Sequence, residues 1–168
     1  MLKLFTNSLQ NTSMKKFLFF TFCGFSLYGF GQVNFIMPPE ADIFYTKAIS
    51  TIKPSIKSVI ERKAVSLKNL NVNSDSLTAA LKSDPLLKGV NQPSLEIITV
   101  LIIVQISKNA DEELKTLVMK VRKADEQSSN EIAKGSELII GRKSRIAETV
   151  TAAMKKVSFQ ENTLNSLK

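Results

Sequence analysis

Residues 95–106 read Leu-Glu-Ile-Ile-Thr-Val-Leu-Ile-Ile-Val-Gln-Ile, and nine of these twelve residues are apolar. Three interpretations of this stretch are open: a helix buried on nearly every side, a surface kept apolar for a partner, and a β-strand. Ile and Val suit strands as well as helices, and periodicity does not decide for so short an apolar run. The residues that follow favour a helix, because their pattern continues from this stretch without a break.

That pattern is a coiled-coil seam. Apolar and small side chains recur at alternating four- and three-residue steps after Pro93, which is the last proline of the chain. The positions of this first seam are Val100, Ile103, Ser107, Ala110, Leu114, Leu117, Val121, Ala124 and Ser128. Charged residues such as Glu112 and Lys115 occupy the positions between them, as expected for the solvated faces of a helix.

A second seam follows with its phase shifted by one residue. Its positions are Ile139, Ile146, Val150, Ala153, Val157, Leu164 and Leu167. The shift falls around residues 128–136, where Gly135 follows Lys134 and is a plausible helix stop. Gly135 and Gly141 are therefore predicted to break a helix or to permit close packing. We expect two long helices folded as an antiparallel hairpin, while one uninterrupted rod stays open because a single Gly costs a helix only about 1 kcal/mol.

Shorter helices are expected before this hairpin. A helical pattern begins at Glu40 and continues to Leu70, with a break or kink at Pro54. Residues 71–75 predict a turn, and Ser74 or Asp75 is expected to cap a short helix through Lys82. A single helical turn is expected between Asp84-Pro85 and Gly89, and residues 91–94 open the first long helix. The predicted fold class is all-α: a helical bundle with short N-terminal helices and a long, coiled-coil-like C-terminal antiparallel hairpin.

The N-terminal segment has the pattern of a secretory signal peptide. Lys15-Lys16 precedes about a dozen mostly apolar residues, and the small residues Gly29 and Gly31 stand at positions −3 and −1 of a cut before Gln32. The apolar stretch is too short to span a bilayer, which argues against an uncleaved anchor. We predict a signal peptide at 1–31, with Met14 as a possible true start, an extended arm at 32–39 and a single helical domain at 40–168. The predicted location is extracytoplasmic, in the periplasm or secreted.

Removal of residues 1–31 would leave a chain with no Cys and no His, 20 basic residues and 15 acidic residues. Such a chain lacks thiolate and imidazole ligands and the commonest catalytic base. Neighbouring carboxylates, as in residues 111–113, point around a helix and do not converge. An enzyme that uses Ser, Lys or carboxylates is the least favoured alternative. We therefore expect no catalytic residues, no metal and no cofactor.

The net charge of +5 on the predicted mature chain is spread along the sequence, and Arg142-Lys143-Ser-Arg145 is its main tight basic cluster. Without aromatic residues nearby to stack on bases, this cluster does not predict nucleic-acid binding. The favoured function is helix-mediated binding, to an unknown protein or envelope component or to a second copy of the chain. The predicted partner-binding residues are Ile98, Leu101, Ile102, Leu114, Leu117 and Val121. The alternative is a membrane-active protein that lays Leu95–Ile106 on a lipid surface.

Overall fold

The computed structural model describes residues 37–168 apart from 69, 124–125 and 158–160, and the side chains of 126–129 are also left undescribed. Residues Phe35–Lys168 form one compact unit. The helices are α2 (Pro39–Thr51), α3 (Pro54–Ser66), α4 (Ser74–Leu81), α5 (Gln92–Val121), α6 (Glu126–Lys156) and α7 (Glu161–Asn165), with a 3₁₀ turn, η1, at Pro85–Leu87. No β-strand occurs within these described ranges, so the all-α prediction is confirmed. The predicted signal peptide lies outside them.

Turn chemistry sets the boundaries of the short helices. Pro39 opens α2 and Pro54 opens α3, because a proline fits the first helical turn and lacks only an N–H that has no partner there. The Asn73 side chain caps α4 by accepting hydrogen bonds from the N–H groups of Asp75 and Ser76, both at 3.0 Å. Sequence reasoning placed this cap one or two residues too late, and it placed Pro39 in the extended arm.

The connection to α5 follows the expected order of cap, proline and glycine. Asp84 caps η1 through a 3.1 Å hydrogen bond from the N–H of Leu86. Gly89 adopts a φ of +85°, which a residue with a side chain rarely adopts, and so it ends this turn. Asn91 then caps α5 by accepting from the N–H of Ser94 at 2.9 Å.

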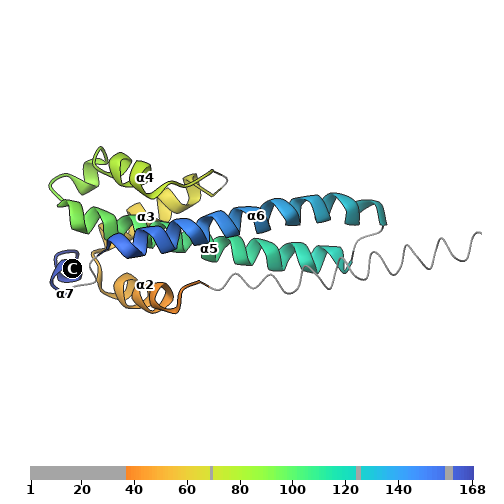
Figure 1. Ribbon diagram of the computed structural model, residues 1–168, viewed down its shortest axis with the longest axis horizontal. Coiled ribbons are helices and arrows are strands. Elements are labelled where there is room, and N and C mark those ends of the chain that lie inside the picture. The colour runs from red at the N-terminus through yellow and green to blue at the C-terminus, as the bar shows by residue number, and fades with distance from the viewer. Residues whose placement is uncertain (1–36, 69, 124–125, 158–160) are drawn as a thin grey trace, which may run out of the picture. The chain divides into compact units, whose positions relative to one another are not determined.

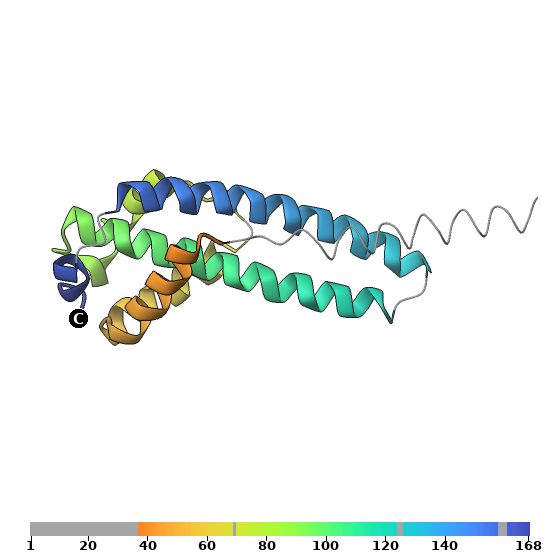
Figure 2. The same ribbon diagram turned by 60° about the horizontal axis from the view of Figure 1, so that its bottom comes forward.

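Helix α5 is the centre of the compact unit. It contacts α2, α3, α4, α6 and α7, and Figures 1 and 2 show it running beside α6 in the opposite direction. Residues 97–104 are all buried, and Ile98, Leu101 and Ile102 have no exposed surface. The interpretation of residues 95–106 as a helix buried on nearly every side is therefore confirmed, and the strand interpretation is wrong. The Ile and Val residues of this stretch would also suit a strand, but here they fill the space between closely packed helices.

The two long helices form the predicted antiparallel hairpin, but its turn is not at Gly135. Helix α5 ends at Val121 and α6 begins at Glu126, whereas Gly135 and Gly141 lie inside α6. A Cβ added at either glycine would have nothing within 4 Å apart from the backbone of its own helix. Neither glycine breaks the helix or permits a close approach, so this prediction was wrong.

The second seam is divided between two helices. Ile146, Val150 and Ala153 of α6 are buried as expected, but α6 ends at Lys156 and Leu164 belongs to α7. Leu167 follows α7, is 1% exposed, and its carbonyl accepts a 2.9 Å hydrogen bond from the N–H of Lys53. The C-terminal segment thus closes the bundle beside the junction of α2 and α3.

A polar contact joins α2 to α5 around Tyr45. Its hydroxyl donates a hydrogen bond to the Gln105 side chain, and the Lys108 ammonium lies 4.3 Å from the ring centroid. Lys108 also pairs with Asp42 at 2.9 Å. Burial, and to a lesser degree the charge of Glu61, raises the pKa of Tyr45 above its ordinary value of 10.0.

Replacement of Tyr45 by Phe tests this contact. Loss of the hydrogen bond is expected to lower the free energy of unfolding by about 1 kcal/mol at neutral pH. Because the folded-state pKa is raised, the contribution of Tyr45 is complete below pH 10 and is lost as the pH rises through the folded-state pKa. Urea unfolding between pH 7 and 11 should therefore show a smaller alkaline loss for Tyr45→Phe. Parallel losses in the two proteins would contradict the contact.

Candidate functional site: the outer half of the hairpin

The hairpin has two halves with different surroundings. The inner half (residues 92–110 of α5 and 143–156 of α6) is covered by α2, α3, α4 and α7. The outer half (residues 111–121 of α5 and 130–142 of α6) continues past these helices, as both ribbon views show. A contact from outside the hairpin reaches this part near its base, where Lys68, in the turn after α3, forms a 2.5 Å ion pair with Glu113.

Two helices alone do not bury their own seam. In the inner half, Val100, Ile103, Ser107 and Ala110 are at most 1% exposed. In the outer half, the seam residues of both helices are only partly buried, and Met119 and Leu138 are 57% and 76% exposed. The partly buried apolar residues are Leu114, Leu117, Val118, Val121, Ile132, Ala133, Ile139 and Ile140.

The six predicted partner-binding residues are therefore separated by the fold. Leu114, Leu117 and Val121 lie together on the outer half, with part of each side chain accessible. Ile98, Leu101 and Ile102 lie in the core and have no surface for a partner in this conformation. Sequence reasoning missed Met119 and Leu138, because neither falls on a seam position. The sequence feature that could have identified them is a large apolar side chain on a helix face otherwise occupied by charged residues.

Ion pairs join α5 to α6 at the base of the outer half. Arg142 of α6 pairs with Glu113 of α5 at 2.5 Å, and Glu113 also pairs with Lys68. Lys143 pairs with Asp111, and its side chain is only 7% exposed. Burial lowers the pKa of Arg142. The tightest basic cluster of the sequence is thus directed largely into the hairpin and does not form an open cationic patch.

An open groove of about 540 Å³ runs along the outer half beside α5. Leu117 of α5 and Ile139 of α6 supply its apolar lining, and Glu112, Thr116 and Lys120 line it along α5. These three residues are spaced four apart, which places them on one face of the helix. Lys68 and Glu113, which pair with each other, also line the groove. The groove therefore combines an apolar strip with this pair and with Glu112 and Lys120, which lie eight residues apart along α5.

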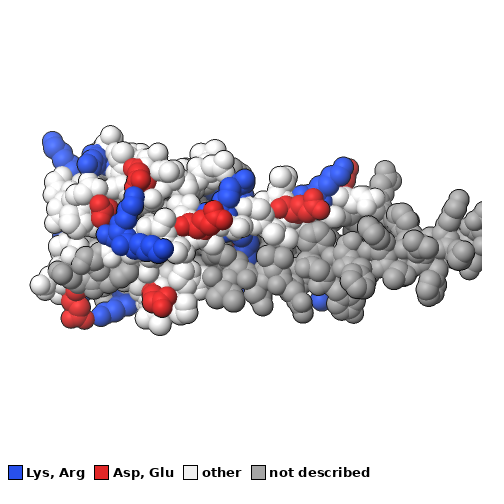
Figure 3. Space-filling model, viewed as in Figure 1, with Lys and Arg blue, Asp and Glu red and all other residues white. Residues whose placement is uncertain are grey.

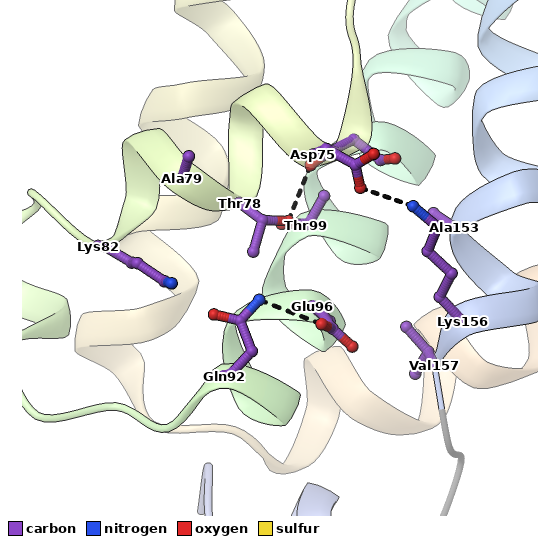
Figure 4. Close-up of a pocket in the computed structure, with 11 residues that line it drawn as sticks. Asp75, Thr78, Ala79, Lys82, Gln92, Glu96, Thr99, Ala153, Lys156 and Val157 are labelled. Carbon is purple, nitrogen blue, oxygen red and sulfur yellow. Dashed lines mark hydrogen bonds and ion pairs between the residues drawn. The ribbon is translucent and has the colours of Figure 1, made fainter.

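A second pocket, of about 150 Å³, lies where α4, α5 and α6 meet (Figure 4). Its polar groups mostly bind each other: Asp75 accepts from Lys156 at 2.7 Å, and Gln92 donates to Glu96 at 3.1 Å. The hydroxyl oxygens of Thr78 and Thr99 lie 2.7 Å apart, and this pair is buried. The Asp75–Lys156 and Thr78–Thr99 contacts fasten α4 to α6 and to α5, so the pocket is best explained as a structural junction.

Neither region has the arrangement of a metal site. No group of three or more Asp, Glu, His or Cys side chains that could hold a metal ion is found in the part of the chain that the structure describes. On the face shown in Figure 3, acidic and basic side chains lie next to each other along the molecule. This mixture of signs gives no continuous positive stripe on that face.

The chain has no matching protein family, no matching curated protein and no matching solved structure. By length and composition α5 is also able to cross a membrane, but 72% of its apolar window is buried inside the bundle. The core helix of a soluble protein has the same composition. The class defined by the fold is thus an all-α bundle with a projecting two-helix hairpin.

Proposed function

We propose that this is an exported, non-enzymatic helical protein that acts in the cell envelope by binding through the outer half of its hairpin. The N-terminal sequence pattern supports export, with cleavage before Gln32. The absence of Cys and His from the sequence after residue 31 supports a non-enzymatic role. Binding is supported by a single structural observation, which is the partly exposed apolar seam of the outer half.

Partly exposed apolar side chains on a rigid helical support are a common feature of protein-binding surfaces. Closure of the seam by a partner helix would remove Leu114, Leu117 and Ile139 from water. Each large aliphatic side chain that is fully buried contributes about 1.5–3 kcal/mol. A few such residues supply a useful affinity even after the cost of association.

Site-specific photocrosslinking in intact cells tests this proposal. A photoreactive residue at Met119 or Leu138 samples the outer half, and one at Val65 or Leu86 provides a matched control on the inner bundle, since these four positions are 55–76% exposed. Adducts are expected from Met119 and Leu138 and not from the two controls. They should be found in the envelope or secreted fraction, on a chain that begins at Gln32. Equal adducts from all four positions would count against a specific surface.

A membrane-active protein is the second candidate, and the length and apolarity of α5 favour it. This function requires the hairpin to open, because the apolar segment is buried in the closed bundle. Co-sedimentation with anionic lipid vesicles separates the two candidates. A closed binding protein is expected to stay in the supernatant, whereas a protein that lays α5 on lipid would sediment with the vesicles.

A further inference from the structure

The charge pattern of the groove is complementary to itself. Glu112 lies four residues before Thr116 and Lys120 lies four residues after it, and all three line the groove. When two copies of α5 are placed antiparallel with a two-fold axis at Thr116, each Glu112 comes opposite the partner's Lys120. A two-fold axis makes every such contact twice, so one favourable pair in the sequence becomes two at the interface.

The contacts that Glu112 and Lys120 make within one copy leave both side chains available to pair with a second copy. Glu112 pairs with Lys115 at 2.6 Å, but both side chains are about 70% exposed. An exposed pair of this spacing contributes only a few tenths of a kcal/mol in a helix. Lys120 has no ion pair with any described residue. Exchange of the local pair for an intermolecular one therefore costs little.

The apolar lining of the groove fits the same arrangement. Leu117 and Ile139 lie beside the charged face, and Met119 is exposed close by. Two hairpins placed side by side form a four-helix bundle, in which Leu117 and Ile139, the apolar residues that line the groove, gain the cover that they lack in one copy. Thr116 is small enough to lie at the crossing of the two helices.

We propose that the partner of the groove is a second copy of this chain, bound antiparallel along α5 with Glu112 of each copy paired to the partner's Lys120. This inference rests on the proposed binding role of the outer half and names the occupant of that surface. The arrangement is isologous and closed, so it gives a dimer and not a filament.

Charge reversal tests the pairing. Glu112→Lys places lysine opposite lysine twice in a homodimer, and Lys120→Glu places glutamate opposite glutamate twice. Each single variant should weaken the dimer by at least about tenfold, because opposed like charges are costly at an interface. An equimolar mixture of the two single variants should restore the dimer, since every contact then joins opposite charges. The double variant Glu112→Lys/Lys120→Glu should dimerise like the natural protein for the same reason.

Sedimentation velocity of the full protein purified from expressing cells, run over micromolar concentrations, measures these states. Glu148→Lys and Lys88→Glu make the same charge changes at exposed positions away from the groove and should leave the dimer intact. Circular dichroism of each variant verifies its fold. A monomeric natural protein overturns the inference, and so does a mixture of single variants that stays monomeric. Continued crosslinking of a monomer from Met119 to a different envelope protein would leave the proposed binding role standing while excluding the self-pairing.

Discussion

Replacement of Leu101 by Ala is expected to destabilise the protein by about 3 kcal/mol, within the range found for buried Leu-to-Ala changes in protein cores. Leu101 is 0% exposed and lies in the part of α5 that other helices surround. The loss combines the transfer of apolar atoms with a cavity that neighbouring helices fill only in part. Urea unfolding followed by circular dichroism measures it, with an unchanged dependence on denaturant if the fold is preserved.

Leu138→Ala is the matched control, because it makes the same chemical change on α6 at a side chain that is 76% exposed. Its effect on the free energy of unfolding should stay within about 0.5 kcal/mol. A loss at Leu138 as large as the loss at Leu101 would mean that the two halves of the hairpin are equally covered. That result would remove the structural basis for a binding surface on the outer half.

The buried ion pair between Asp111 and Lys143 gives the second large effect. Asp111→Ala removes the carboxylate that pairs with the ammonium group of Lys143, a side chain that is only 7% exposed. This change should lower the free energy of unfolding by about 2 kcal/mol. This is below the usual 3–5 kcal/mol for a broken buried pair, because Asp111 is itself 39% exposed and water can reach the site. Lys143→Met keeps the aliphatic stem and removes the buried charge, so its effect should stay within about 1 kcal/mol.

Thermal and denaturant unfolding of the two variants measure this asymmetry. Glu112→Ala is the control, since Glu112 and Lys115 form an exposed pair whose loss should cost less than about 0.5 kcal/mol in the monomer. Equal costs for Asp111→Ala and Glu112→Ala would show that the Lys143 pair is as accessible to water as a surface pair. The buried contact between α5 and α6 would then be absent.

Local chemistry made several elements predictable from sequence. The prolines at 54 and 85, the caps Asp84 and Asn91 and the glycine at 89 act through the backbone of their nearest neighbours, so their effects do not depend on the rest of the fold. The heptad steps likewise predicted the buried positions Ser107 and Ala110, between which Lys108 and Asn109 are only partly buried. Leu114 and Leu117 were identified for the same reason.

The position of the hairpin turn was not predictable in this way. Residues 122–125 (Arg-Lys-Ala-Asp) contain no glycine or proline, whereas Gly135 looks like a helix stop. A single glycine inside a helix costs only about 1 kcal/mol, and packing against α5 outweighs this cost along α6. The length of each arm is therefore set by tertiary contacts, among them the pairing of Arg142 with Glu113.

Burial on several sides also limited the prediction of the site. Ile98, Leu101 and Ile102 were predicted to bind a partner although a buried helix was the favoured interpretation of residues 95–106, because a sequence pattern does not say what covers an apolar face. The structure shows that other helices of the same chain cover them. The end of α6 was missed for a related reason, since Leu164 and Leu167 keep the apolar spacing although they belong to a separate C-terminal segment.

Fluorescence resonance energy transfer between the start of α5 and the end of α6 tests the existence of the hairpin most directly. Dyes are attached through cysteines placed at Gln92 and Lys155, both exposed, in a chain whose Cys23 is replaced by Ser. In the hairpin these positions lie at the same end, where Gln92 and Lys156 line one pocket, so the distance should be on the order of 20 Å. Efficient transfer is the expected result. A continuous rod would separate the dyes by about 95 Å at 1.5 Å per residue, and transfer close to zero would contradict the hairpin and the surface proposed on it.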